Sequence, residues 1–364
     1  MGNLIVLGDS DIHDVLINLS RTEILAFRDV IARCLSDYSV SDERKYQPLP
    51  GVINRPEGQK CLFRPFTSSD AVGAKIIVQP APTSTAASGL HGMIAVCDSD
   101  GLPSGILNAE EVTGYRTSLS ALIPYLWRRH TERIVVFGAG KQALWHLRLA
   151  LALRGDEIES IVIVNRTASR AETLLAKLKQ ENESRWKSAA TMQCVDPSRL
   201  DFQECLKDHL LTVDAVFCTV GATEPLFPAS YITTEGRERL PYISAVGSWQ
   251  PDMIELDPEL LQQAVKRISP GSKAGSVLVD DREGVLHHSG EAARSKIVTE
   301  HLVEVGEIEG LRHIDGDKES LQYWLKDGLL LYKSVGVGMV DLAASNAILA
   351  LARERKLGTT ISQF

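Results

Sequence analysis

The spacing of apolar and polar positions predicts an α+β arrangement for the first third of the chain. Residues 12–35 carry apolar side chains at helical spacing, with a helix start at Ser20-Arg21-Thr22-Glu23. The Pro-, Gly- and charge-rich stretch 38–58 predicts a loop or an edge strand. Strands are predicted within 1–7 and over the short apolar runs 61–63, 74–78, 92–97 and 105–107. The turn Asp98-Ser99-Asp100-Gly101 predicts a hairpin, so we expect an antiparallel sheet.

From residue 133 the pattern becomes one of buried strands that alternate with helices. The run 133–137 is continuously apolar, which is typical of a strand covered on both faces. A helix is predicted over 117–130 before it, and helices over 141–153, 168–178, 321–326 and 342–355 after it. Further strands are predicted over 161–164, 192–195, 215–220, 242–246 and 277–280. The fold class is therefore α/β: a doubly wound parallel sheet domain over 121–319, inserted in a discontinuous α+β domain over 1–120 plus 320–364.

Composition and charge narrow the range of partners. The 364 residues carry a formal net charge of -8, so we expect neither nucleic acid nor a membrane as a partner. No stretch of the sequence approaches the length of a membrane span. The six cysteines include no C-x-x-C pair, which argues against a metal site and a disulfide framework and favours a reducing, cytoplasmic location.

The strongest local motif is the turn Gly138-Ala139-Gly140-Lys141-Gln142-Ala143, directly after a predicted strand and before a helix. The first Gly allows a tight turn, the second lets backbone N–H groups approach a diphosphate, and the Ala allows close packing of helix and strand. The helix N-terminus adds donors and a partial positive charge. This pattern predicts a bound dinucleotide; the alternative is a tight turn without a ligand. We expect cofactor contacts from this turn and from residues after later strands: Gly138, Ala139, Gly140, Lys141, Gln142, Thr219, Val220, Gly247 and Ser334.

The segment after the second strand of this unit favours NADPH over NADH. NAD enzymes usually place an acid there, whereas Asn165, Arg166, Thr167 and Arg170 include none. A guanidinium can bind a 2′-phosphate with two parallel hydrogen bonds. We therefore predict NADPH as the cofactor, with NAD as a second possibility, and these four residues as contacts. The alternative is that both arginines are ordinary solvated charges.

Several motifs in the same order make the chain from Lys75 onward resemble the ornithine cyclodeaminase/mu-crystallin family. The matching segments are 74–78, 98–103, 115–118, the dinucleotide turn, 247–251, 255–257, 279–282, 332–336 and 340–343. The resemblance implies a split substrate-binding and dimerisation domain around a Rossmann-like domain, and a homodimer. Members of the family include cyclodeaminases, alanine dehydrogenases and NADPH-dependent reductases of cyclic ketimine carboxylates.

The resemblance also assigns two catalytic candidates. Arg116 matches the family arginine that binds the substrate carboxylate, and a planar guanidinium suits a planar carboxylate. It comes just before the predicted helix start; the alternative is a surface pair with Glu110 or Glu111. Lys75 matches the family's active-site lysine, and burial would let it hold a carboxylate or transfer a proton. Its alternative is an outward-facing position on an antiparallel strand.

Two departures from the family pattern leave the substrate open. Trp249 stands where cyclodeaminases have an Asp that engages the substrate amine, which favours the imine-reductase branch because Trp can be neither base nor charge. Arg64 stands where the family has Met, and is a candidate for a displaced positive charge; the alternative is an ordinary salt-bridged arginine.

The function predicted from these residues is an NADPH-dependent reductase of the C=N bond of an imine or ketimine carboxylate, an amino-acid-type substrate. Arg116 and Lys75 are the catalytic candidates, Arg64, Trp249 and Asp341 are substrate-binding candidates, and Ser334 lies near the cofactor. For Asp341 and Ser334 the alternative is helix capping or domain packing. Two other functions stay open: an ornithine cyclodeaminase-type lyase that releases ammonia, and a non-catalytic NADPH-binding protein.

Overall fold

The computed structural model describes residues 3–84, 89–234, 236–237, 239–266, 273–311 and 318–364. The chain divides into two compact units, residues 1–116 with 337–364 and residues 117–336, which we call the first and second unit. The sequence-based domain ranges had their second boundary near 320. The return to the first unit comes later because the strand β14 (Leu330–Lys333), which the sequence pattern did not reveal, belongs to the sheet of the second unit.

The first unit is built on a sheet with the strand order β15-β1-β6-β5-β4-β3-β2. The strands are β1 (Leu4–Leu7), β2 (Gly51–Asn54), β3 (Lys60–Thr67), β4 (Ala71–Gln79), β5 (His91–Asp98), β6 (Pro103–Asn108) and β15 (Thr359–Ile361). Strands β2 to β6 pair antiparallel as predicted. The expectation of an antiparallel sheet is wrong for β1, which pairs parallel with β6 because helices and a long excursion separate the two strands in sequence.

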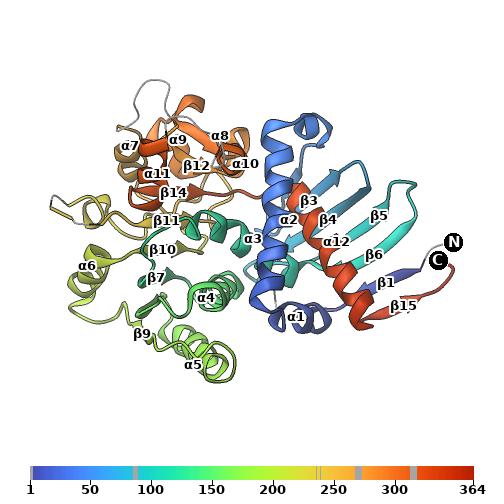
Figure 1. Ribbon diagram of the computed structural model, residues 1–364, viewed down its shortest axis with the longest axis horizontal. Coiled ribbons are helices and arrows are strands. Elements are labelled where there is room, and N and C mark those ends of the chain that lie inside the picture. The colour runs from blue at the N-terminus through green and yellow to red at the C-terminus, as the bar shows by residue number, and fades with distance from the viewer. Residues whose placement is uncertain (1–2, 85–88, 235, 238, 267–272, 312–317) are drawn as a thin grey trace. The chain divides into compact units, whose positions relative to one another are not determined.

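Helices cover one face of this sheet. They are α1 (Asp9–Ile17), α2 (Arg21–Val40) and α12 (Gly338–Arg355), and Figure 1 shows α2 and α12 lying along each other over the strands. The predicted helix start is confirmed: Ser20 caps α2, and Glu23 returns a hydrogen bond to its backbone N–H. Gly105 in β6 lies under α12, since a Cβ there would lie 2.6 Å from Leu349. Side chains in register with Gly105 therefore face the helices.

The helix α3 (Ala109–Tyr125) starts eight residues earlier than predicted. Asn108 accepts a hydrogen bond from the Glu110 N–H at 2.8 Å, which satisfies a donor of the first turn. Because this turn is polar, the apolar spacing used for the prediction misses it. The placement of Arg116 before a helix start is therefore wrong: Arg116 lies inside α3.

The second unit contains a doubly wound sheet with the order β13-β12-β14-β11-β10-β7-β8-β9, and every described pairing in it is parallel. Its strands are β7 (Arg133–Phe137), β8 (Ser160–Val164), β9 (Thr191–Val195), β10 (Ala215–Cys218), β11 (Tyr242–Ala245), β12 (Val277–Val279), β13 (Leu302–Glu304) and β14. Its helices are α4 (Lys141–Arg154), α5 (Ala168–Ser184), α6 (Phe202–Thr212), α7 (Pro258–Val265), α8 (Arg282–His288), α9 (Gly290–Ser295), α10 (Val305–Leu311) and α11 (Lys318–Lys326). This sheet confirms the predicted α/β fold class.

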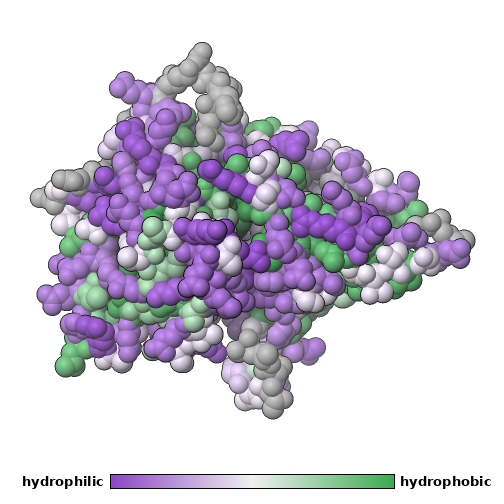
Figure 2. Space-filling model, turned by 60° about the horizontal axis from the view of Figure 1, so that its bottom comes forward, coloured by the Kyte–Doolittle hydropathy of each residue, from purple (hydrophilic) through white to green (hydrophobic). Residues whose placement is uncertain are grey.

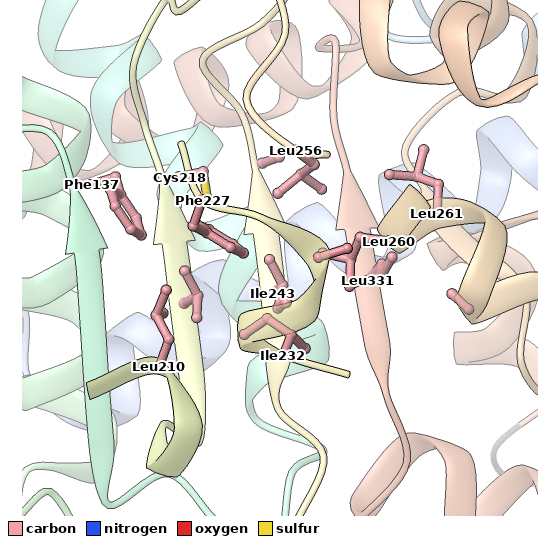
Figure 3. Close-up of a cluster of buried hydrophobic side chains, with 14 of the residues drawn as sticks. Phe137, Leu210, Cys218, Phe227, Ile232, Ile243, Leu256, Leu260, Leu261 and Leu331 are labelled. Atoms are coloured by element: carbon pink, nitrogen blue, oxygen red, sulfur yellow. The ribbon is translucent and has the colours of Figure 1, made fainter. Parts of the chain in front are cut away.

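An apolar layer between the central strands and neighbouring helices holds the second unit together. Figure 3 shows Phe137 and Cys218 beside Phe227, and Leu331 beside Leu260, in one apolar layer along adjacent strands. These side chains are at most 3% exposed. Burying each large apolar side chain stabilises the fold by roughly 1.5–3 kcal/mol, so the strand ends that follow this layer are held on a rigid base.

The surface in view in Figure 2 is mostly hydrophilic. Figure 2 shows hydrophilic side chains over most of the face in view, with smaller apolar patches between them. Among the described residues, no helix combines the length and the apolar composition that crossing a bilayer requires.

Candidate active site

A buried ion cluster lies in the first unit where α12 crosses the sheet. Asp341, near the start of α12, is fully buried, and its Oδ1 accepts hydrogen bonds from Lys75 Nζ and Arg116 Nε, both at 2.8 Å. Lys75 comes from β4 and also donates to Thr113 Oγ1 of α3 at 3.4 Å. A charged group is costly to bury unless it is paired, and here both cations converge on one oxygen. The cluster thus fixes the positions of two predicted catalytic residues.

Arg64 adds a further positive charge to this cluster. It lies opposite Lys75 in the antiparallel register of β3 and β4, so both side chains face the helices. Its Nη1 lies 3.9 Å from Asp341 Oδ2, an oxygen that accepts no hydrogen bond from the described residues. Lys75, Arg116 and Arg64 together outnumber the single carboxylate, so the cluster favours an added anion such as a carboxylate.

Burial and charge shift the pKa values of the cluster in opposite directions. Burial lowers the pKa of Lys75 to about 7, although the charge of Asp341 acts to raise it. Burial acts to raise the pKa of Asp341, but the charges of Arg116, Lys75 and Arg64 outweigh it and hold that pKa below its ordinary value. Near neutral pH the aspartate is therefore ionised, while Lys75 can exist in either protonation state.

These contacts decide between some of the alternatives that the sequence left open. Lys75 is 1% exposed, so the outward-facing position is wrong. Arg116 is 4% exposed, so its alternative position in a surface pair is also wrong. Sequence reasoning missed Thr113, which lies one helical turn before Arg116 on α3 and could have been found only with the correct helix start.

The second unit forms the predicted dinucleotide turn between β7 and α4. Gly138 has φ of +114°, and a Cβ at this position would lie 2.5 Å from Thr219 Oγ1. Gly140 is the N-cap of α4 and supplies no side-chain cap, and a Cβ built on it would meet nothing within 4 Å. An uncapped helix start with open space before it fits a diphosphate. Lys141 and Gln142 are half-buried in the first turn, and Ala139 is half-buried beside them.

The residues predicted to select the cofactor lie after β8 at the start of α5. Asn165 donates to the Thr167 carbonyl oxygen at 2.8 Å, which shapes the turn. Arg166, Thr167 and Arg170 are exposed. The nearest acid beyond them in sequence is Glu172, so the strand end itself carries no carboxylate.

Carboxylates that the sequence analysis did not single out hold the ends of the other central strands. Glu255 accepts backbone hydrogen bonds from Val220, after β10, and from Gly247 and Ser248, after β11. Asp280 accepts hydrogen bonds from Ser334 Oγ at 2.6 Å and from the Gly336 N–H at 2.7 Å. Ser334 thus has a structural contact, as the packing alternative expected. Glu255 belongs to a segment that matched the family, but its sequence gave no sign of its partners.

The predicted site residues therefore form separate groups. Arg64, Lys75, Arg116 and Asp341 come together in the first unit. The predicted cofactor residues line the carboxyl ends of β7, β8, β10, β11 and β14 in the second unit, together with the half-buried Trp249. A doubly wound sheet with a Gly-rich turn at this edge defines a Rossmann-type dinucleotide-binding unit.

Comparisons with known proteins agree with this class. The family described as Shikimate / quinate 5-dehydrogenase matches residues 125–244, which lie within the second unit. A Delta(1)-pyrroline-2-carboxylate reductase of Bacillus cereus is 25% identical over 342 residues, 91% of this chain and 93% of that protein. The ketimine reductase mu-crystallin of Macropus fuliginosus is 24% identical over 330 residues, 87% of this chain and 89% of that protein.

A solved structure extends the likeness to the whole fold. The Thermococcus litoralis Delta(1)-pyrroline-2-carboxylate reductase, in complex with NADH and L-proline, superposes with a TM-score of 0.74 at 20% identity, covering 98% of this chain and 100% of that chain. The chain is therefore similar to named imine reductases over most of its length and shares the fold of one of them, as its resemblance to the ornithine cyclodeaminase/mu-crystallin family implied.

Proposed function

We propose that the protein is an NADPH-dependent oxidoreductase that reduces the C=N bond of an imine or ketimine carboxylate, acting on C–N bonds of amino-acid-type substrates. The observation that carries the proposal is the buried cluster of Lys75, Arg116 and Arg64 around Asp341, whose excess positive charge suits a carboxylate. Relatives that cover nearly the whole chain are named Delta(1)-pyrroline-2-carboxylate reductase and ketimine reductase. When bound, the reduced nicotinamide supplies the hydride.

Each residue of the cluster has its own proposed role in binding the substrate or transferring a proton. Arg116 holds the substrate carboxylate with its planar fork, while Asp341 Oδ1 fixes the orientation of Arg116 and Lys75. Lys75 has a pKa of about 7 and so can hold or release a proton at Nζ near neutral pH. Arg64 of the same cluster and Trp249 of the second unit are the other proposed substrate-binding residues. The gain in rate comes mainly from holding the two reactants at reacting distance.

The direct test is NADPH oxidation with Delta(1)-pyrroline-2-carboxylate and its six-membered ring homologue. We expect saturable oxidation, a large loss of kcat/KM in Arg116→Met and Lys75→Met, and no loss in Glu354→Gln, an exposed change on α12. Absence of oxidation with either imine, despite NADPH binding, identifies a non-catalytic binding protein. Release of ammonia from ornithine without net oxidation of a nucleotide identifies a cyclodeaminase.

The preference for NADPH rests on the strand end after β8. Arg166 and Arg170 are exposed there, and no acid lies between Asn165 and Arg170 to repel a 2′-phosphate. NADH and NADPH titrations of the same protein test this, and tighter binding of NADH overturns it.

We also propose a cytoplasmic homodimer that forms through the uncovered face of the first unit's sheet. Phe63, Ile76 and Met93 lie side by side on β3, β4 and β5, on the face opposite Lys75. Ile53 and Val72 share this face, and Ile53, Phe63, Val72 and Met93 are at least 40% exposed. A contiguous apolar sheet face of this kind marks an interaction site, and sedimentation analysis of the protein tests for the dimer. The free cysteines fit a reducing cytoplasm.

A further inference from the structure

The turns that follow β10 and β11 are joined by a single buried carboxylate. Glu255 Oε1 accepts a hydrogen bond from the Val220 N–H at 2.8 Å, and Oε2 accepts from the N–H groups of Gly247 at 2.7 Å and Ser248 at 3.0 Å. The side chain is fully buried. Each oxygen therefore holds a different turn, and both oxygens are needed to hold the two turns together.

The two turns approach each other closely enough to need this connection. A Cβ built on Gly247 would lie 2.4 Å from the backbone N and O of Val220 and 2.6 Å from Glu255 Oε1. Only a residue without a side chain fits there, and a small displacement of either turn changes the contact. Glu255 thus sets the separation of the two backbones.

A second layer of buried groups holds Ser248, whose N–H donates to Glu255. Lys333, at the end of β14, donates to the oxygen atoms of the Ser248 carbonyl and hydroxyl, both at 2.6 Å. Glu291 of α9 accepts from Ser248 Oγ at 2.6 Å and lies 3.6 Å from Lys333 Nζ. The charged and titratable groups that face Glu255 are Lys333, Glu291 and the thiol of Cys218 in β10.

The strand order indicates which half of a bound dinucleotide would lie next to these turns. The diphosphate turn follows β7, which has β8 on one side and β10, then β11, on the other. The strand end after β8 takes the adenosine half in a Rossmann-type unit, so the half that carries the nicotinamide extends toward β10 and β11. Val220 and Gly247 lie on that side.

We infer that Glu255 is a positioning residue for the nicotinamide half of the cofactor, acting through the backbones of Val220 and Gly247. The inference rests on the proposed use of NADPH. Its carboxylate accepts hydrogen bonds from the backbone N–H groups of both strand ends. Replacing it by an amide leaves one acceptor oxygen, so at least one turn loses its hydrogen bond and faces an NH2 group.

The test compares NADPH with adenosine 2′,5′-bisphosphate, a fragment that lacks the nicotinamide half. In Glu255→Gln we expect the dissociation constant of NADPH to rise about tenfold, the size of effect that follows from losing one hydrogen bond to a charged acceptor. We expect the dissociation constant of the fragment to change less than about twofold. Asp214→Asn is the matched control, because Asp214 is a buried carboxylate at the opposite end of β10 that accepts from the Arg133 N–H.

The two dissociation constants decide whether Glu255 positions the nicotinamide half. Equal weakening of NADPH and fragment, or no weakening of either, overturns the positioning role of Glu255. If the unchanged protein binds neither molecule, the proposed function fails instead. If Glu255→Gln does not fold, the ratio of the two dissociation constants is measured on the unchanged protein between about pH 6 and about pH 9. Burial raises the pKa of Glu255 to about 7, so its carboxylate becomes protonated toward about pH 6. Protonation of Glu255 should weaken the binding of NADPH but not that of the fragment. A ratio that stays constant over this pH range refutes the inference.

Discussion

The substitution Asp341→Asn tests how strongly the buried ion cluster holds the first unit together. It removes the charge that accepts hydrogen bonds from Lys75 and Arg116 while keeping the size of the side chain. Removing one partner of a buried ion pair costs about 3–5 kcal/mol, because the remaining charge stays buried without compensation. Lys75 can relieve part of this cost by losing its proton, since its pKa is already about 7. We therefore expect a loss of about 3 kcal/mol near neutral pH.

The loss should depend on pH with a definite sign. Burial lowers the pKa of Lys75 to about 7, whereas an unfolded lysine titrates near about 10.4. The unfolded chain binds more protons between these values, so this residue makes the fold more stable as pH rises through that window. Asp341 opposes the lowering, so Asp341→Asn moves the pKa of Lys75 below 7. The loss should thus be larger below pH 7 than above it, by about 1.4 kcal/mol for each unit of that shift.

The assay must report on the first unit alone. All five tryptophans lie in residues 117–336, so their fluorescence follows the second unit. Hydrogen exchange of β4 amides, measured by mass spectrometry, gives the free energy of opening of the first unit. Glu354→Gln, an exposed change on α12, is the control. A loss below about 1 kcal/mol in Asp341→Asn, or one that does not vary with pH, refutes the reasoning.

Three further predictions concern the cofactor, the dimer and the Gly-rich turn. Arg166→Glu with Arg170→Glu should weaken the binding of NADPH at least about tenfold more than that of NADH, because the proposed role of the two guanidinium groups is to bind the 2′-phosphate; equal losses in fluorescence titrations contradict this. Met93→Asp should convert the proposed dimer into a monomer in analytical ultracentrifugation, and unchanged sedimentation rules out this face. Gly138→Ala should abolish saturable dinucleotide binding and lower thermal stability, because a Cβ would lie 2.5 Å from Thr219 Oγ1 and φ is +114°. The strained conformation alone costs about 1–3 kcal/mol, so unchanged melting refutes it.

The sequence predicted best those parts of the fold whose apolar pattern is continuous. The strand 133–137 was placed correctly at both ends, and the helix that follows was placed within one residue of its end. In contrast, β14 was missed although its residues are buried. A run of four residues directly after a helix is too short to show the alternation of apolar and polar positions that identifies a strand. The early start of α3 was missed because its first turn is polar and Asn108 caps it from outside.

The residues of the site could be predicted from the sequence, but their contacts with one another could not. The sequence identified Arg64, Lys75, Arg116 and Asp341 one by one, but their convergence depends on α12 returning to the sheet, which no local pattern reports. The role of Glu255 was not predictable, because its backbone partners carry no sequence signal. Contacts to main-chain N–H groups depend on the conformation of the turn rather than on the residue type.

The return of the C-terminal segment to both sheets has a consequence for synthesis of the protein on the ribosome. β14 lies between β12 and β11, and Asp341 reaches back 266 positions to Lys75. A nascent chain that has emerged only to residue 320 therefore lacks a central strand of one sheet and, in the other unit, the carboxylate that accepts from Lys75 and Arg116. Because long-range contacts form late and leave apolar edges exposed until then, neither unit can reach its final structure before residues 330–341 have been synthesised.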